Sequence, residues 1–381
     1  MGRVTKRASN IPPFIVMDIL EKAHELEKKG QNIVHLEIGE PDFCTPQCIC
    51  DAATEAIARG ETHYTHSLGI IELREAICNY YYQQYGVSIT PDRVIVTSGT
   101  SPALFMLFSA LLEAGDEIIM SDPHYPCYPN FAEFLGAGAV TVKAEEKDAF
   151  QLEPDLIKKS MGPRTRAVII NSPSNPTGNL LSSDRMEAIA EIGLPIVSDE
   201  IYHGLVYGEK EHSILEYTEN AFVLNGFSKL FAMTGWRLGY IIAPPDFIRP
   251  LQKVQQNFFI SAGSISQWAG VAALTKAQDD VRAMKETYDQ RRRYMIERVR
   301  KMGFGLAVEP AGAFYMLANA KHLTESSYDL AIDILEKAGV GVAPGVDFGK
   351  NVEGFLRFSY ANSIENIKEG MDRIEGYLRT L

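Results

Sequence analysis

Seven short apolar segments rich in valine and isoleucine recur along the middle of the chain. Each is bounded by Gly, Pro, Asp or Asn, a pattern typical of buried β-strands. They span residues 93–98, 116–122, 139–144, 166–173, 195–200, 221–227 and 238–245. Helical stretches such as 102–115 and 182–193 lie between them. This alternation predicts an α/β fold in which helices flank a mostly parallel sheet, with ligands collecting at the carboxyl ends of the strands.

The two ends of the chain have a different pattern. A helix over 16–29 and a strand within 32–43 precede the alternating region, and a long charged helix from about 281 follows it. Strand-like segments and further helices complete the C-terminal part, which is an α+β pattern. We therefore predict a large domain over residues 45–285 and a smaller α+β domain formed by residues 1–44 and 286–381.

Charge and composition exclude several classes of protein. The formal net charge is −12, and no block of Lys and Arg offsets it, which argues against a nucleic-acid partner. No apolar run is long enough for a membrane span, and the first ten residues lack the apolar core of a signal peptide. We therefore expect a cytoplasmic protein with no membrane association.

Three of the five cysteines, Cys44, Cys48 and Cys50, lie close together. Their spacing, without a nearby histidine, matches none of the common zinc patterns. We predict reduced thiols and no metal.

One lysine and one arginine interrupt an otherwise apolar run, "NGFSKLFAMTGWRLGY" (225–240). These are Lys229 and Arg237, and charged side chains are seldom buried without a partner. Either both lie on the solvent face of a helix, or a ligand meets them inside the protein.

A strand runs into Gly99-Thr100-Ser101, and Pro102 then stands at the first position of a helix. Free backbone N–H groups at such a helix N-terminus suit a phosphate, although this stretch taken alone favours a plain capped helix. Asp199 ends another predicted strand, with Tyr202 three residues on. This carboxylate either caps a helix or faces a ligand at the sheet edge. Asn175 lies in a turn after a third strand.

Four motifs occur in one order along the chain: "SNPTG", "SDEIY", "FSKLFAMTGWRLG" and "LRFSY". In that order and spacing the chain resembles the fold-type I pyridoxal-phosphate (PLP) enzymes. Among these it is similar to the class I aminotransferases of the aspartate aminotransferase type. The resemblance extends from about residue 40 to about residue 358.

The resemblance implies a role for each motif in binding the cofactor. Lys229 would hold PLP covalently, and Arg237 would bind its phosphate together with Gly99, Thr100 and Ser101. Asp199 would pair with the pyridine nitrogen, and Tyr202 and Asn175 would hydrogen-bond the phenolic oxygen. Tyr125, in "DPHYPCYP", would stack on the ring.

The resemblance also implies a substrate site and a partner. Arg357 would bind the substrate α-carboxylate, assisted by Asn175 and by the backbone at Gly39. Tyr64 would cross a dimer interface to the phosphate bound by the other subunit, so a homodimer is implied. His203 follows Tyr202 and either lines the site or is structural.

These roles imply an aminotransferase that moves an amino group between an L-amino acid and a 2-oxo acid by a ping-pong mechanism, with Lys229, Asp199 and Tyr202 as catalytic residues. Bacterial aspartate enzymes that the chain resembles have a threonine and a lysine where Val16 and Ser101 stand here. We therefore expect a neutral or aromatic amino donor rather than aspartate. Two alternatives are a PLP-dependent carbon–sulfur β-lyase and a non-catalytic regulatory protein of the same fold.

Overall fold

The computed structural model describes residues 3–381, so the first two residues of the predicted small domain lie outside the described chain. The helices are α1 Lys6–Asn10, α2 Ile15–Lys28, α3 Gln47–Ala58, α4 Ile71–Tyr85, α5 Thr100–Leu111, α6 Cys127–Phe134, α7 Pro154–Ser160, α8 Ser183–Ala190, α9 Pro245–Phe258, α10 Ser264–Lys276, α11 Gln278–Lys301, α12 Ser327–Asp333 and α13 Ile364–Leu378. The strands are β1 Val34–His35, β2 Val94–Thr97, β3 Glu117–Asp122, β4 Gly138–Lys143, β5 Thr165–Asn171, β6 Ile196–Asp199, β7 Ala221–Gly226, β8 Gly239–Ile242, β9 Tyr315–Asn319, β10 Val340–Gly341, β11 Ala343–Pro344 and β12 Phe355–Ser359.

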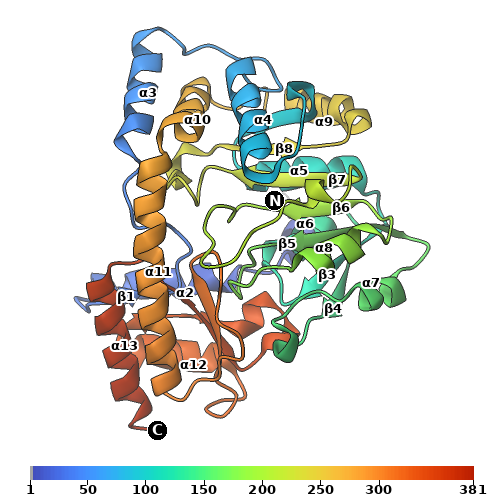
Figure 1. Ribbon diagram of the computed structural model, residues 1–381. Helices are drawn as coiled ribbons and strands as arrows, with labels where there is room; N and C mark the ends of the chain where they lie inside the picture. Colours follow the sequence, from blue (N-terminus) through green and yellow to red (C-terminus); the bar gives the residue numbers. More distant parts are fainter. Residues whose placement is uncertain (1–2) are drawn as a thin grey trace.

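The seven predicted apolar segments all form strands, and these make one sheet in the order β2-β8-β7-β6-β5-β3-β4 (Figure 1). Strands β3 to β7 pair in parallel, whereas β8 runs antiparallel to both β2 and β7. The predicted α/β class with a mostly parallel sheet is therefore confirmed.

Both faces of this sheet are buried because successive strand residues enter two different hydrophobic cores. In β5, Ile169 packs into the core that contains Leu104 and Leu107 of α5, while Val168 and Ile170 pack into the other core. Helices cover both faces, and a strand buried on both sides needs apolar residues at nearly every position. This explains why the strands are continuous Val/Ile runs rather than alternating ones.

Segments from the N-terminal and C-terminal parts of the chain lie together in the lower part of the molecule (Figure 1), where β1 pairs in parallel with β10 and a three-stranded sheet has the order β11-β12-β9. Helix α13 packs on β1, and α11 packs on α13. The division of the chain into domains at residues 45 and 285 remains a prediction.

The strand expected within 32–43 is shorter than predicted, because β1 spans only Val34–His35. The chain then leaves the sheet at Glu37 and Gly39, whose backbone oxygens accept hydrogen bonds from Arg357 and Lys229. These carbonyl groups therefore accept hydrogen bonds from charged side chains instead of from a neighbouring strand. Among residues 3–381, no helix is long and apolar enough to cross a membrane.

Candidate active site

One edge of the central sheet collects the side chains that the motifs singled out. The parallel strands β3, β5, β6 and β7 end there, and they lead directly to Tyr125, Asn175, Asp199 and Lys229. Because β8 runs antiparallel, it begins at the same edge, just after Arg237. The topology therefore explains why residues scattered over more than a hundred positions meet.

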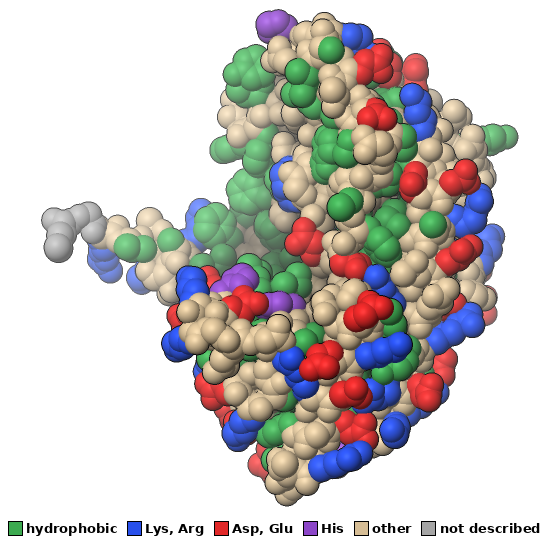
Figure 2. Space-filling model, turned by 90° about the vertical axis from the view of Figure 1, so that its left-hand side faces the viewer, with side chains coloured by type: hydrophobic (Ala, Val, Ile, Leu, Met, Phe, Trp, Pro, Cys, Tyr) green, Lys and Arg blue, Asp and Glu red, His purple; other side chains and the backbone are tan. Residues whose placement is uncertain are grey.

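A cavity of about 330 Å³ opens at this edge, a size that suits a small-molecule site. Figure 2 shows the molecule hollowed between its upper and lower parts, with hydrophobic side chains around the hollow. Every predicted site residue except Gly99 and Tyr64 lines the cavity. The predicted residues that line it are Val16, Gly39, Thr100, Ser101, Tyr125, Asn175, Asp199, Tyr202, Lys229, Arg237 and Arg357.

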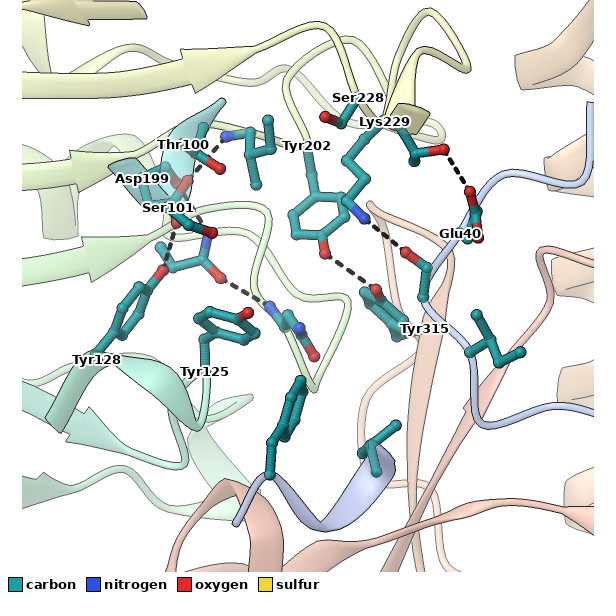
Figure 3. A pocket seen from close by; sticks show the side chains of 18 of the residues that line it. Glu40, Thr100, Ser101, Tyr125, Tyr128, Asp199, Tyr202, Ser228, Lys229 and Tyr315 are labelled. Atoms are coloured by element: carbon teal, nitrogen blue, oxygen red, sulfur yellow. Dashed lines mark hydrogen bonds between the residues drawn. The ribbon is translucent and has the colours of Figure 1, made fainter. Parts of the chain in front are cut away.

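The Lys229 amine points into the cavity and donates a hydrogen bond of 2.6 Å to the backbone oxygen of Gly39 (Figure 3). Desolvation by burial lowers the pKa of Lys229 to about 8, against the opposing attraction of the Glu40 carboxylate. An amine with a lowered pKa is a better nucleophile and base near neutral pH.

The Asp199 carboxylate is buried at the carboxyl end of β6. Its Oδ2 accepts a hydrogen bond of 2.6 Å from the Tyr128 hydroxyl, and its Oδ1 accepts one of 3.2 Å from the backbone N–H of Ile201. Desolvation raises the pKa of Asp199 to about 6, although these hydrogen bonds oppose the shift. No Lys, Arg or His within the described chain forms an ion pair with it, so the buried acid lacks a cation.

Gly99, Thr100 and Arg237 form a concave corner where β2 passes into α5. Gly99 has a φ of +100°, and a Cβ there would lie 2.6 Å from Nη2 of Arg237. Glycine is thus required both by the backbone conformation and by the approach of the guanidinium. The first backbone N–H groups of α5 and this exposed arginine make a cradle for an anion.

Arg357, on β12, is only 2% exposed. Its Nη1 donates to Oδ1 of Asn175 at 3.0 Å and its Nη2 donates to the backbone oxygen of Glu37. The guanidinium lies 4.3 Å from the ring centroid of Tyr315 and 4.7 Å from that of Phe348. None of the ion pairs within residues 3–381 includes it, so the cavity contains a buried cation that lacks an anion.

Several residues of the site escaped the sequence reasoning. Tyr128 supports Asp199, and the Tyr315 hydroxyl lies 3.0 Å from that of Tyr202 (Figure 3). The carboxylate of Asp347 accepts hydrogen bonds of 3.2 Å from the backbone N–H groups of Ile15 and Val16 at the start of α2. Tyr128 has a local signal, since it shares the run "DPHYPCYP" with Tyr125. Tyr315 and Asp347 lie in segments that appear in the sequence as ordinary strand and loop.

Other residues considered from the sequence lie elsewhere. Tyr64 is 82% exposed and lies outside the cavity lining. His203 is buried behind the site, and its Nδ1 lies 2.7 Å from the Tyr85 hydroxyl and 3.5 Å from Oε2 of Glu200. It is therefore a structural residue in this chain. Cys44, Cys48 and Cys50 are free thiols.

The residues present fit PLP. The cofactor has a phosphate, which suits the cradle at Gly99, and a pyridine nitrogen, which when protonated would give the buried Asp199 carboxylate its missing cation. Its aldehyde requires an amine of lowered pKa, such as Lys229. PLP would not provide an anion for Arg357, so this guanidinium remains available to bind the carboxylate of an amino acid.

Comparison with known proteins agrees with this geometry. The family described as "Aminotransferase class I and II" matches residues 31–374. The (5-formylfuran-3-yl)methyl phosphate transaminase of Methanocaldococcus jannaschii is 42% identical over 379 residues, covering 98% of this chain and 99% of its own. The aspartate/prephenate aminotransferase of Thermus thermophilus is 37% identical over 381 residues, covering 98% of each chain.

Solved structures similar to this chain are also aminotransferases or resemble them. A crystal structure from Methanococcus jannaschii, described as similar in its active site to kynurenine aminotransferases, has a TM-score of 0.92 at 42% identity and covers 99% of this chain and 100% of its own. The aspartate aminotransferase of Thermus thermophilus with maleate has a TM-score of 0.95 at 36% identity over 100% of both chains.

Fold and site together define a PLP-dependent enzyme of fold type I, and the chain belongs to the family of class I and II aminotransferases. The protein is therefore an aminotransferase, as predicted. Its substrates are an amino acid and a 2-oxo acid, and its cofactor is PLP held covalently by a lysine.

Proposed function

We propose that this aminotransferase uses Lys229 to hold PLP and to carry the proton, and that it prefers a neutral or aromatic L-amino acid over aspartate. The observation that carries the preference is the set of cations around the cavity. Within the described chain, Lys229, Arg237 and Arg357 are the lysines and arginines that line it, and each already has a role. A distal carboxylate would lack a cation.

The rest of the cavity wall supports the same preference. Phe14, Val16, Met17 and Leu20 of the N-terminal segment line it, and they offer an apolar surface to a side chain. Glu40 also lines the cavity, and its carboxylate would repel a second carboxylate on the substrate. A similar solved structure is described as resembling kynurenine aminotransferases in its active site, which supports an aromatic donor. Relatives named as aspartate aminotransferases do not support this preference.

Binding of the amino acid begins at Arg357. Its planar guanidinium is held by Asn175 and by the backbone of Glu37, and a carboxylate would supply the missing anion. Fixing the carboxylate orients the Cα–H bond of the substrate toward the Lys229 amine. When bound, PLP would supply an electron sink for the electron pair of the Cα–H bond, and Asp199 would keep its ring nitrogen protonated.

Lys229 then acts as the general base, because its lowered pKa leaves much of the amine uncharged near pH 8. The Nζ accepts the Cα proton of the amino acid and later redelivers it. The hydroxyls of Tyr202 and Tyr315 and the amide of Asn175 surround the same space and would position the ring oxygen. In a ping-pong scheme the first oxo acid leaves before the second one binds at Arg357.

We also propose a homodimer with shared sites. The support is that Tyr64 is 82% exposed and that Phe258, at the end of α9, is 68% exposed, which leaves large apolar side chains in solvent. Sedimentation should give twice the chain mass. Tyr64→Phe should weaken PLP binding, because one hydrogen bond to the phosphate would be lost.

The function is tested with a panel of amino donors and 2-oxoglutarate. The proposal expects glutamate formation, with kcat/KM for aromatic or neutral donors above that for aspartate. Higher efficiency with aspartate would overturn the preference. Pyruvate and ammonia formed without an acceptor would indicate β-elimination instead of transfer.

A further inference from the structure

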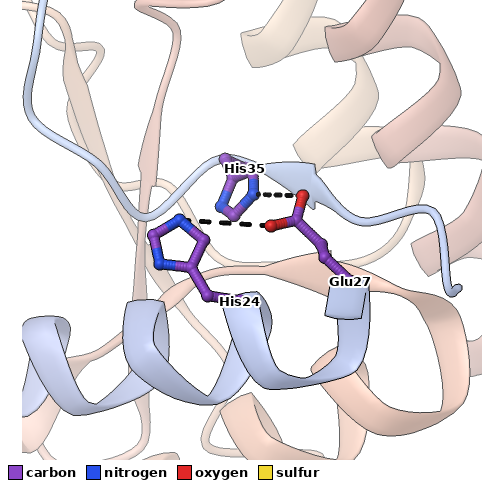
Figure 4. Close-up of side chains that lie close together, drawn as sticks. All are labelled: His24, Glu27 and His35. Atoms are coloured by element: carbon purple, nitrogen blue, oxygen red, sulfur yellow. Dashed lines mark hydrogen bonds and ion pairs between the residues drawn. The ribbon is translucent and has the colours of Figure 1, made fainter. Parts of the chain in front are cut away.

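A group of three potential metal ligands lies outside the active site, between α2 and β1 (Figure 4). His24 and Glu27 are one turn apart on α2, and His35 projects from β1 toward them. Nε2 of His35 lies 3.2 Å from Oε1 of Glu27, and Nε2 of His24 lies 4.0 Å from Oε2 of the same carboxylate. All three ligand atoms lie within 4.8 Å of one another.

A buried carboxylate orients one of these histidines. Nδ1 of His35 lies 2.7 Å from Oε1 of Glu37, whose side chain is fully buried. This contact places the proton of the imidazole on Nδ1 and directs Nε2 toward Glu27 and His24. Histidines that bind metals in proteins are commonly held in this way by a carboxylate on the other ring nitrogen.

Two carboxylates flank the imidazole of His35. Glu37 contacts its Nδ1 at 2.7 Å and Glu27 contacts its Nε2 at 3.2 Å. A metal ion bound by Nε2 of His35 and by Glu27 would place positive charge between these two carboxylates.

We propose that His24, Glu27 and His35 form a binding site for a divalent transition metal such as Zn²⁺. Two imidazole Nε2 atoms and one carboxylate oxygen would bind the ion, with water at the fourth position. This donor set suits zinc, and bonds of about 2.0–2.2 Å place tetrahedral ligands roughly 3.3–3.6 Å apart. The side chains of His24 and Glu27 are 53% and 38% exposed, so they are free to close the remaining distance.

The location indicates a clamp rather than a catalytic metal. The first turns of α2 carry Val16, Met17 and Leu20 to the cavity, and the ion would fasten the later part of the same helix to β1. Two residues beyond His35, the backbone oxygen of Glu37 accepts a hydrogen bond from Arg357. Metal binding would therefore stiffen two elements that border the substrate site while leaving the reacting groups untouched.

The test is equilibrium dialysis of EDTA-treated holoenzyme against Zn²⁺, with bound zinc measured by mass spectrometry. The expected result is one zinc per chain and a higher melting temperature with zinc than without. His24→Ala and Glu27→Gln should each weaken this binding at least ~10-fold, because only two protein ligands remain. Neither substitution disturbs the contact between His35 and Glu37.

His322→Ala is the matched control, since it removes another exposed histidine far along the chain. It should leave zinc binding unchanged. The proposal is overturned if no zinc binds, or if the affinity is the same in His24→Ala and Glu27→Gln as in the unchanged protein. Zinc held by the thiols would give that second result.

Discussion

The Lys229 amine and the Gly39 carbonyl, 190 positions apart in sequence, are joined by a hydrogen bond of 2.6 Å. Lys229 follows β7 of the central sheet, and Gly39 lies in the loop after β1. A Cβ on Gly39 would lie 1.9 Å from the Tyr315 hydroxyl, so a side chain is excluded there. The backbone of the N-terminal segment can therefore approach the amine closely and help to orient it toward the cavity.

Replacing Lys229 by alanine should lower kcat for transamination at least ~10²-fold. The substitution removes both the general base and the amine that binds PLP covalently. Circular dichroism should show an intact fold. Borohydride reduction of the unchanged holoenzyme followed by peptide mapping should place the fixed PLP at residue 229. A label at another lysine would refute the assignment.

The pH dependence of PLP capture by the apoprotein should reflect the lowered pKa of Lys229. The neutral amine is the reactive form, and its fraction rises with pH through the folded pKa of about 8. We expect the rate of covalent capture, followed by absorbance, to rise between pH 7 and 9 with a midpoint near 8. A midpoint close to the ordinary lysine value of 10.5 would contradict this.

Asp199→Asn should stabilise the apoprotein while it impairs catalysis. The folded pKa of about 6 exceeds the ordinary aspartate pKa of 3.8, so the folded state binds more protons and stability falls as pH rises through that window. Above pH 6 the cost reaches about 3 kcal/mol, which asparagine would avoid. Denaturant unfolding should therefore show a gain at pH 7.5 that shrinks toward pH 4. Activity should fall ~10²-fold or more, because the ring nitrogen loses its anion.

Arg357→Lys should raise KM for both the amino acid and the oxo acid about 10–100-fold, because an ammonium cannot replace the planar fork. The affinity for PLP, measured by fluorescence titration, should change little. Unchanged Michaelis constants would remove Arg357 from the substrate site.

The double substitution Ser101→Lys and Val16→Thr should increase kcat/KM for aspartate about 10-fold, the effect of one new ion pair of ~1.4 kcal/mol. Both positions line the same cavity, so the new ammonium can reach a distal carboxylate. Ser101→Met with Val16→Thr is the control, since it adds length without charge. An equal gain in that control would show that size rather than charge limits aspartate.

Much of this architecture could be predicted from the sequence because the sheet is buried on both faces. Continuous Val/Ile runs identified every strand of the central sheet, and parallel topology then placed Asn175, Asp199 and Lys229 at one edge. Local pattern alone left the role of each motif open, and only the order of the motifs along the chain gave the resemblance from which the roles were predicted. The strand after α2 was predicted too long. The backbone of Leu36 still bonds to Gly341 and Ser359, but the carbonyl groups of Glu37 and Gly39 accept hydrogen bonds from side chains instead.

Tyr315 and Asp347 could not be predicted because their partners lie far away in sequence. Tyr315 contacts Tyr202 and the guanidinium of Arg357 only after β9 and β12 have paired. Asp347 meets the start of α2 across more than three hundred residues. Neither a tyrosine in a strand nor an aspartate in a loop carries a local signal for such contacts.

The contact of Asp347 with the backbone of Ile15 and Val16 has a consequence for biosynthesis. Every strand of the central sheet has been synthesised by Ile242, and the residues of α9 and α10 that cover its two faces, such as Leu251 and Ala269, follow soon after. Phe14 and Val16 line the amino-acid pocket, and the hydrogen bonds that hold their segment can form only when Asp347 has left the exit tunnel. A nascent polypeptide can therefore acquire its scaffold well before it can recognise a substrate.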